Sequence, residues 1–341
     1  MVEPQNAPPG WLLPLLGAAG VAGDQPFDTN GTRFVMRGDI PRQVGKLSDE
    51  QGQTAETFGF KWRKDDLFDQ KEYLAQVRSW MLERYGDVEH AHWWDDYGPA
   101  PLILDAGCGA ALTAIEMFGD RLKSARYLGA DVSTAVDVAR ERFGARGYGG
   151  GFIQCDLNSL PLADGSVDIA FSEGVLHHTD STADAFAAVA RLIKPGGRFL
   201  FYVYAKKGPV REFTDDHIRH QLQSMTAEEA WQAVLPLTRL GEALGNLTIE
   251  IDVPEDIAVL GIPKGRIDLQ RLFYWHVCKA FYRPDWTIEQ MNSINYDWFA
   301  PANAHRHTPE EVRGWCADAR LTVEREIVEE AGITVIARKD A

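Results

Sequence analysis

Five short apolar runs constrain the fold of this chain more than any other feature. Each is continuous in apolar residues, which is typical of strands buried on both faces of a sheet. They read PLILDAG, RYLGADVS, GFIQCDL, VDIAFSEG and GRFLFYVYA, between residues 101 and 205. Helical patterns separate most of these runs, with apolar side chains on one face of residues 134–144 and 181–193. Strands that alternate with helices predict a parallel sheet with helices on both faces.

The pattern resumes near the C-terminus. Thr308, Pro309 and Glu311 form a capping box with proline at the first helical position, so a helix is expected to begin there. Two strands follow, LTVEREIVE and ITVIARK, joined by a turn through Gly332. We therefore expect an α/β, doubly wound and mostly parallel sheet that ends in an antiparallel hairpin, with the antiparallel strand at its edge.

The remaining segments differ in pattern from this core. Residues 1–50 are rich in Gly, Pro and Asp, which predicts a loosely built extension. Tyr73, Val77, Trp80 and Met81 lie at helical spacing and predict a helix that leads into the core. The expected division is an extension over 1–60, a lead-in helix over 61–97, the core over 98–205, a mostly helical cap over 206–305 and a closing helix and hairpin over 306–341.

Charge and cysteine content narrow the class of protein. The net charge of −15, without a basic stripe, argues against a protein that follows nucleic-acid phosphates. The four cysteines are scattered and form no CxxC pair, so we expect a reducing, cytoplasmic environment. No apolar run approaches the roughly 20 residues of a membrane span. The stretch GWLLPLLGAAGVAG looks faintly like a signal sequence but lacks its basic region.

The stretch ILDAGCGAA suggests a ligand site directly after the first core strand. Gly107 and Gly109 would let the backbone approach a ligand at the start of the next helix. A dinucleotide fingerprint needs a third glycine, which is missing here. Asp105 would also repel a pyrophosphate, so an amino group or a cation is the better match.

Further acids follow the next three strands. Asp131, Asp156 and Glu173 each come at the end of a predicted strand. Because ligands of open parallel sheets bind at the carboxyl ends of the strands, a ligand there would meet a row of hydrogen-bond acceptors.

Four motifs together, in order and at normal spacing, resemble those of class I S-adenosylmethionine (SAM)-dependent methyltransferases of the type 11 kind. They are ILDAGCGAA, YLGADVS, CDLNSLPLADGSVDIAFSEGVLHHTD and IKPGGRFLFYV. The resemblance covers residues 100–205 together with the closing helix and hairpin. It implies a Rossmann-like fold, SAM as the cofactor and methyl transfer as the reaction.

The resemblance also implies which residues hold the methionine end of SAM. Asp105 and the backbone of Gly107, Cys108 and Gly109 would do so. Ala111 departs from the family, which often has a third glycine at this position, and a methyl group there is usually tolerated.

The adenosine end would be held by the next two motifs. The resemblance implies that Asp131 accepts hydrogen bonds from both ribose hydroxyls and that Val132 packs on the adenine. Asp156 would accept from the adenine amino group, with Leu157 beside it. Taken singly, Asp131 could be a solvated strand end and Asp156 an Asx turn, but their placement on consecutive strands favours binding.

The candidates nearest to the transferred methyl lie in EGVLHHTD. A general base is needed only when the acceptor loses a proton of high pKa, as a hydroxyl does. Glu173, His177 and His178 are the candidate catalytic residues, and we expect His178 to face the pocket. The alternative is that the histidine pair is a structural element of the loop, since many relatives carry a similar LHH.

The segment before the core also resembles a region found in the same family. FVMRGDIPRQV and AETFGFKW resemble a region that often belongs to a small zinc-ribbon-like module. There is no cysteine before Cys108, so any such module is metal-free. Phe58, Gly59 and Trp62 form either a lid over the cofactor or a hydrophobic plug against the core.

The insertion after the fifth strand mixes polar and aromatic groups, which suits a pocket for a polar small molecule. Alternatively, its aromatics form its own core and its charges pair with each other. The residues are Tyr202, Tyr204, Lys206, Arg211, Glu212 and Asp216, and then Asn295, Tyr296, Asp297, Trp298, His305, Arg306 and His307. HRH and HHTD lack a ligand spacing typical of a metal site, so no metal is expected.

These observations lead to one expected function with two alternatives. We expect a cytoplasmic SAM-dependent methyltransferase that acts on oxygen or nitrogen of a polar small molecule, with neither nucleic acid nor membrane as partner. A methyltransferase for RNA or protein and a SAM-binding scaffold without turnover remain open.

Overall fold

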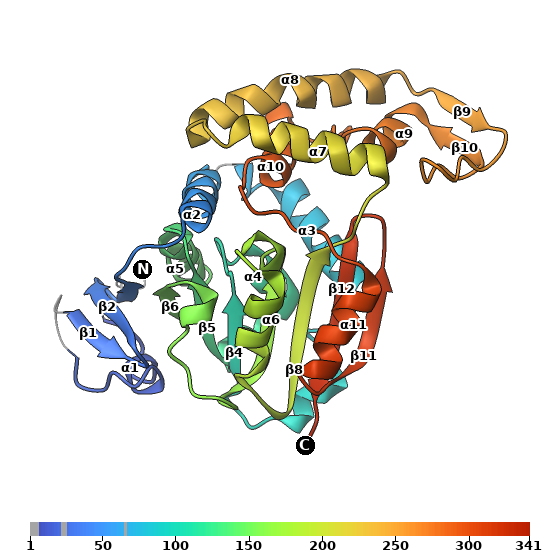
Figure 1. Cartoon of the computed structure of the whole chain (residues 1–341). Coiled ribbons are helices and arrows are strands. Elements are labelled where there is room, and N and C mark those ends of the chain that lie inside the picture. The colour runs from blue at the N-terminus through green and yellow to red at the C-terminus, as the bar shows by residue number, and fades with distance from the viewer. Residues whose placement is uncertain (1–6, 22–25, 65–66) are drawn as a thin grey trace.

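The computed structural model describes residues 7–21, 26–64 and 67–341. A ten-stranded sheet lies at its centre, in the order β1-β2-β3-β6-β5-β4-β7-β8-β12-β11 (Figure 1). The strands are β1 Pro26–Thr29, β2 Thr32–Arg37, β3 Ile40–Gln43, β4 Leu102–Ala106, β5 Arg126–Asp131, β6 Gly151–Gln154, β7 Val167–Glu173, β8 Ile193–Tyr204, β11 Leu321–Val328 and β12 Gly332–Lys339. A separate two-stranded sheet consists of β9 Glu250–Val253 and β10 Gly265–Asp268.

Helices cover both faces and the upper end of the sheet in Figure 1. They are α1 Leu12–Leu15, α2 Asp49–Trp62, α3 Lys71–Tyr85, α4 Leu112–Phe118, α5 Ala135–Ala145, α6 Thr182–Ala190, α7 Pro209–Leu222, α8 Ala227–Asn246, α9 Leu269–His276, α10 Ile288–Phe299 and α11 Pro309–Asp318. Strands β6, β5, β4, β7 and β8 pair in parallel. The predicted α/β, doubly wound and mostly parallel fold is therefore confirmed.

The C-terminal hairpin is confirmed, but its order in the sheet differs from the expected one. Strand β12 is antiparallel to both β8 and β11, and it lies between them, so β11 forms the edge. The reason is burial, because the first six residues of β12 are buried whereas most of β11 is exposed. The more apolar strand takes the inner position, where both of its faces are covered.

The expectation of a loosely built N-terminal segment is wrong for residues 26–43. Strands β1, β2 and β3 form two antiparallel hairpin pairings, and β3 joins the main sheet in parallel with β6. Phe34, Met36 and Ile40 are buried and fix these strands on the core. The expected extension over 1–60 also includes residues 1–6 and 22–25, which lie outside the described residues.

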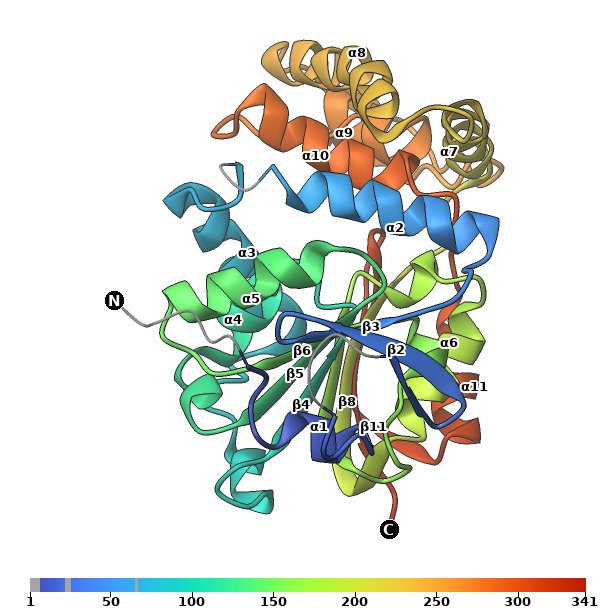
Figure 2. The ribbon, with the colours of Figure 1, turned by 90° about the vertical axis from the view of Figure 1, so that its left-hand side faces the viewer.

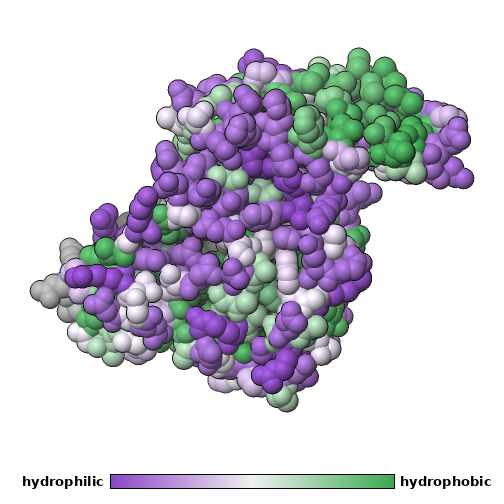
Figure 3. Space-filling view, viewed as in Figure 1, coloured by the Kyte–Doolittle hydropathy of each residue, from purple (hydrophilic) through white to green (hydrophobic). Residues whose placement is uncertain are grey.

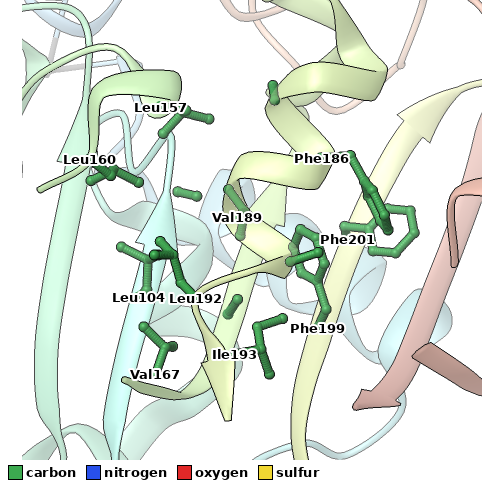
Figure 4. Packing of buried hydrophobic residues seen from close by; sticks show 14 of the residues in the cluster. Leu104, Leu157, Leu160, Val167, Phe186, Val189, Leu192, Ile193, Phe199 and Phe201 are labelled. Carbon is green, nitrogen blue, oxygen red and sulfur yellow. The ribbon is translucent and has the colours of Figure 1, made fainter. Parts of the chain in front are cut away.

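The core beneath α6 shows how the sheet and its helices are held together (Figure 4). Phe186 of α6 stacks on Phe199 of β8 with ring centroids 5.3 Å apart, and Val189 packs in the same cluster as Leu104 of β4. A second cluster covers the opposite face, under α3, α4 and α5. Both faces of the sheet are therefore buried under helices.

The segment after β8 forms a helical cap over those carboxyl ends (Figures 1 and 2). Helices α7, α8, α9 and α10 make up most of it, and α2 lies between the cap and the core (Figure 2). Helices α8 and α10 each begin with a capping box, at Thr226 and Thr287. The two-stranded sheet of β9 and β10 was not predicted.

The far end of the cap carries exposed apolar side chains (Figure 3). Leu240 and Leu247 are exposed near the end of α8, and Ile249 and Ile251 continue this surface into β9. In the part of the chain that the structure describes, no helix is long and apolar enough to cross a membrane.

Candidate functional site

A cavity of about 440 Å³ lies between the carboxyl ends of the strands, helix α2 and the cap. Seven of the eight residues predicted to bind the cofactor line it: Gly107, Cys108, Gly109, Asp131, Val132, Asp156 and Leu157. Glu173 and His178 line the same cavity. The structure thus brings most of the residues predicted for the cofactor and for catalysis to one cavity.

The loop after β4 requires its glycines. The φ angles of Gly107 and Gly109 are +86° and +50°, in the left-handed region that favours glycine. A Cβ atom on Gly107 would lie 2.1 Å from Cγ1 of Val175, and one on Gly109 would lie 2.8 Å from Nε1 of Trp62. Because Trp62 belongs to α2, this helix lies directly on the glycine loop.

Asp131 ties the glycine loop to the end of β5. Its carboxylate accepts hydrogen bonds from the backbone N–H of Gly109 (2.9 Å), the backbone N–H of Ser133 (2.8 Å) and the Ser133 hydroxyl (2.6 Å). An ionised carboxylate has about four acceptor positions, so one remains for a ligand in the cavity. Burial raises the pKa of Asp131, although these three hydrogen bonds oppose that shift.

Asp156 lies where the N-terminal strands meet the core. Its Oδ1 accepts from the backbone N–H of Asn158 at 2.7 Å, and its own N–H donates to Oε1 of Gln43 at 2.9 Å. The Gln154 amide donates to the carbonyl of Val132 at 3.0 Å and joins the two adjacent loops. Asp156 therefore forms an Asx turn and also lines the cavity, so the two interpretations of this residue are compatible. Sequence reasoning missed Gln43, because nothing near it indicates a partner more than 100 residues away.

Asp105 lies beside the glycine loop but does not line the cavity. Asp105 is 1% exposed, and its carboxyl accepts a hydrogen bond from the Tyr127 hydroxyl at 2.5 Å. Burial raises the pKa of Asp105 to about 7, and the bond from Tyr127 opposes this shift. The structure thus separates Asp105 from the other residues predicted for the methionine end.

We expect Asp105→Asn to change how stability depends on pH. The folded chain holds the Asp105 proton up to about pH 7, whereas the unfolded chain releases it near pH 3.8. This group therefore stabilises the fold below about pH 3.8, and the contribution is lost as the pH rises towards 7. At about 1.4 kcal/mol per pH unit the loss amounts to about 4 kcal/mol. Urea unfolding at pH 4 to 7.5 should show the stability of the variant gaining on wild type, and parallel curves would contradict the assignment.

Glu173 is held by its neighbours. Arg84 of α3 forms an ion pair with Oε1, and the Tyr85 hydroxyl donates to Oε2 at 2.5 Å. The Arg84 guanidinium also lies over the ring of Tyr202, 3.9 Å from its centroid. Both carboxylate oxygens are engaged, so Glu173 suits the role of fixing this wall better than that of a base. Sequence reasoning missed Arg84, because it lies on the lead-in helix and nothing near it points to strand β7.

The two histidines differ in their access to the cavity. His177 is fully buried, does not line the cavity and stacks on Tyr204 with centroids 3.6 Å apart. His178 lines the cavity, and its Nδ1 lies 2.6 Å from the carbonyl oxygen of Asn303. Because a carbonyl only accepts, Nδ1 carries the proton and Nε2 keeps its lone pair. Nε2 has no hydrogen-bond partner among the described residues, and burial lowers the pKa of His178 to about 4.

Helix α2 forms a wall of the cavity. Phe58 and Trp62 line it, and the Phe58 ring lies 5.1 Å from the ring of His178. Lys61 of α2 pairs with Asp297 of α10 at 2.8 Å, which joins the helix to the cap. A Cβ atom on Gly59 would lie 3.1 Å from the Thr134 side chain, so α2 approaches the start of α5 closely. This geometry suits a lid more than a plug.

The cap residues singled out from the sequence divide into two groups. Those that line the cavity are Tyr202, Tyr204, Arg211, Asp297 and Trp298. Others pair within the cap, as Arg306 does with Glu212 and Asp216. Lys207 and Lys279 also line the cavity and were missed, although Lys207 directly follows Lys206 in the segment singled out from the sequence. Over the residues that the structure describes, no group of three His, Cys, Asp or Glu side chains could hold a metal ion.

Comparison with known proteins identifies the central part of the chain. Residues 104–201 match the family model of a methyltransferase domain. A malonyl-[acyl-carrier protein] O-methyltransferase of Serratia marcescens is 34% identical over 146 residues, which cover 42% of this chain and 52% of that protein. A tRNA (carboxymethyluridine(34)-5-O)-methyltransferase of mouse is 26% identical and covers 46% of this chain and 23% of that protein. The matches thus span between about a quarter and a half of these relatives.

Solved structures of methyltransferases are similar at low identity. The 1,6-didemethyltoxoflavin-N1-methyltransferase of Burkholderia thailandensis matches at 14% identity and a TM-score of 0.44, over 93% of this chain and 100% of that one. The motifs, the strand order and the family match agree on one identification. Residues 104–201 of this chain are a methyltransferase domain of the class I, SAM-dependent type.

Proposed function

We propose that this protein transfers a methyl group from SAM to oxygen or nitrogen of a polar small molecule. The observation that carries the proposal is the shared cavity, which is lined by the glycine loop, Asp131, Asp156 and His178 and is covered by the cap. Its walls combine aromatic side chains with about as many charged ones, which suits a polar small molecule. The net charge of −15 is in keeping with such an acceptor.

The residues present fit SAM. The glycine loop leaves no room for a side chain at Gly107 or Gly109, so the backbone itself borders the cavity. Asp131 keeps one free acceptor position for a ribose hydroxyl, and Asp156, Val132 and Leu157 would surround the adenine. SAM supplies an electrophilic methyl group on its sulfonium. The chain would align the two reactants and exclude water from them. Helix α2 and the cap are placed to do so because they border the cavity.

His178 is the residue best suited to take a proton from the acceptor. Its Nδ1 is fixed on the Asn303 carbonyl, so the lone pair of Nε2 is the basic site. The lowered pKa keeps the imidazole neutral at physiological pH and also makes it a weaker base. This balance suits an acceptor hydroxyl that is already acidic better than an aliphatic alcohol.

The names of the relatives point to two other acceptor classes, an acyl-carrier protein and a tRNA. A tRNA acceptor would require a basic surface, which an acidic chain supplies poorly. The four cysteines are free thiols, which suits the cytoplasmic location that we include in this proposal.

Incubation of the purified protein with methyl-labelled SAM and a metabolite extract tests the proposal. Label in a small molecule would support it, whereas label in added tRNA or acyl-carrier protein would transfer the proposal to that class. SAM binding without any transfer would support the scaffold alternative.

We expect Asp131→Ala to weaken SAM binding by about tenfold or more, because a buried charged acceptor of hydroxyl groups is lost. Gly109 and Ser133 would also lose the carboxylate that positions them. Isothermal titration calorimetry measures the effect, with Asp120→Ala as the control because Asp120 is exposed and does not line the cavity. Affinity within twofold of wild type in the Asp131 variant would refute the assignment.

A further inference from the structure

Three cationic side chains surround one indole ring at the cap side of the cavity. The Trp298 ring centroid lies 4.6 Å from Nζ of Lys279, 5.5 Å from Nζ of Lys207 and 5.4 Å from the guanidinium carbon of Arg211. All four residues line the cavity. Such a concentration of positive charge is unexpected in a chain whose net charge is −15.

Among the residues that the structure describes, one of these three cations forms an ion pair with a carboxylate. Arg211 pairs with Asp215 at 2.6 Å. Lys207 donates to the backbone carbonyls of Ala205 (2.8 Å), Ala331 (2.9 Å) and Glu330, so its hydrogen bonds are satisfied by neutral groups. Burial and the nearby Arg211 lower the pKa of Lys207 to about 7, so an anionic ligand would stabilise its charged form.

Lys279 is the least satisfied of the three. It is 7% exposed, and its Nζ has neither a hydrogen bond nor an ion pair with any residue that the structure describes. Burial lowers the pKa of Lys279 to about 7, and the carboxylate of Asp297, which is already paired with Lys61 at 2.8 Å, opposes this shift. A buried ammonium group without hydrogen bonds is costly, so the three donors of Lys279 are available for a ligand.

This cluster lies next to the candidate base. The Trp298 ring lies 4.3 Å from the Tyr204 ring, which lies 5.4 Å from the His178 ring. Tyr202 and Tyr274 line the same cavity, and the Tyr274 ring lies 5.2 Å from the guanidinium carbon of Arg211. A ligand that reached both the cluster and His178 would pass between aromatic rings.

We propose that the methyl acceptor carries an anionic oxygen group, a carboxylate or a phosphate, which binds Lys279 beside Trp298 in the field of Lys207. The aromatic walls favour an aromatic body for the same molecule. This inference rests on the proposed function, because it names the class of acceptor for that site. Lys279 donates the hydrogen bonds, and Lys207 contributes through its charge.

The test compares acidic and neutral probes of one shape. Protein saturated with S-adenosylhomocysteine is titrated with 2-naphthoate, 2-naphthyl phosphate and 2-naphthamide, and binding is followed by calorimetry. We expect the better of the two anions to bind about tenfold or more tightly than the amide, since hydrogen bonds between charged groups are the stronger ones. The ratio of carboxylate to phosphate affinity identifies the preferred anion.

Lys279→Met should lower this preference to about twofold or less, because the hydrogen bonds to the anion are lost and only the field of Lys207 remains. Lys64→Met is the matched control, because the Lys64 ammonium also lies 4.6 Å from an indole ring, that of Trp231, but outside the cavity. Equal binding of the acid and the amide by wild type would overturn the proposal. So would equal affinities of the Lys279→Met and Lys64→Met variants for the anionic probe.

Two further measurements keep the result interpretable. If Lys279→Met does not fold, wild-type titrations at 50 and 500 mM salt replace it, and a preference for acid that does not weaken with salt would count against the proposal. Failure of S-adenosylhomocysteine to bind would refute the proposed function alone. The probe titrations would then be run without S-adenosylhomocysteine, and they would still decide whether an anion binds Lys279.

Discussion

Replacing Arg211 with methionine is expected to lower the free energy of unfolding by about 3–5 kcal/mol, the usual cost of leaving one member of a buried ion pair without its partner. Arg211 and Asp215 are each 1% exposed and are joined by a 2.6 Å bond. Arg211 also donates to the carbonyl of Tyr274, and Asp215 accepts from the Trp298 indole at 2.7 Å. The pair thus connects α7, α9 and α10, and its loss would leave a buried carboxylate with one hydrogen bond.

Urea unfolding measures this effect, and two variants serve as controls. Arg211→Met combined with Asp215→Leu removes both charges and should recover most of the lost stability, since well-packed apolar residues often replace a buried pair without cost. Arg313→Met removes an exposed pair with Glu326 and should cost less than about 1 kcal/mol. A loss of that small size in the single Arg211 variant, or a double variant that is less stable than it, would show that the pair does not hold the cap together.

The arrangement of the core was predictable because its signals are local. Continuous apolar runs such as residues 102–106 and 199–203 are buried on both faces, and the acids that follow them reach one edge of the sheet through parallel topology alone. The capping box at Thr308 was equally readable, since its partners lie three residues apart. Local patterns of this kind do not depend on the rest of the fold.

Pairings between distant segments were not predictable. Arg84 and Glu173 are 89 residues apart, and Tyr127 and Asp105 are 22 apart. In both cases the partner changes what the acid does, because Glu173 is paired with Arg84 and Asp105 is bonded to Tyr127 and does not line the cavity. The sequence places an acid at a strand end, but its side chain's environment depends on which residues the tertiary fold brings to it.

The N-terminal strands and Lys279 were missed for a related reason. Strand β2 buries Phe34 and Met36 in alternation with more exposed residues, and so short an alternation in a glycine-rich stretch is a weak signal. Lys279 lies in HVCKAFYR, where nothing distinguishes it from a surface lysine. Its burial follows from the fold of the cap, and its role depends on the position of Trp298, which is 19 residues away.

His178→Ala is expected to lower the turnover number by about 10²–10⁴-fold if the acceptor is a hydroxyl, since this is the usual contribution of a general base. SAM affinity should stay nearly unchanged, because His178 is not among the residues assigned to the cofactor. The wild-type rate should rise with pH through an apparent pKa of about 4, below which the imidazole is protonated and cannot accept. The sequence alone suggested a value near roughly 6.5, and burial accounts for the difference. The variant should lack this acidic limb.

His178→Asn separates a catalytic role from a structural one. Its side-chain amide can still donate to the Asn303 carbonyl, as Nδ1 does in wild type at 2.6 Å, but it has no basic nitrogen. If His178 takes the proton, both variants lose the rate and the acidic limb. If it only holds the loop after β7 against residue 303, asparagine restores the rate that alanine loses, and the limb remains. An acceptor that is a thiol or a neutral amine needs no base, and both substitutions would then cost about tenfold or less through alignment alone. Pairs of pH–rate profiles for the three proteins therefore report on His178 and also on the chemistry of the acceptor.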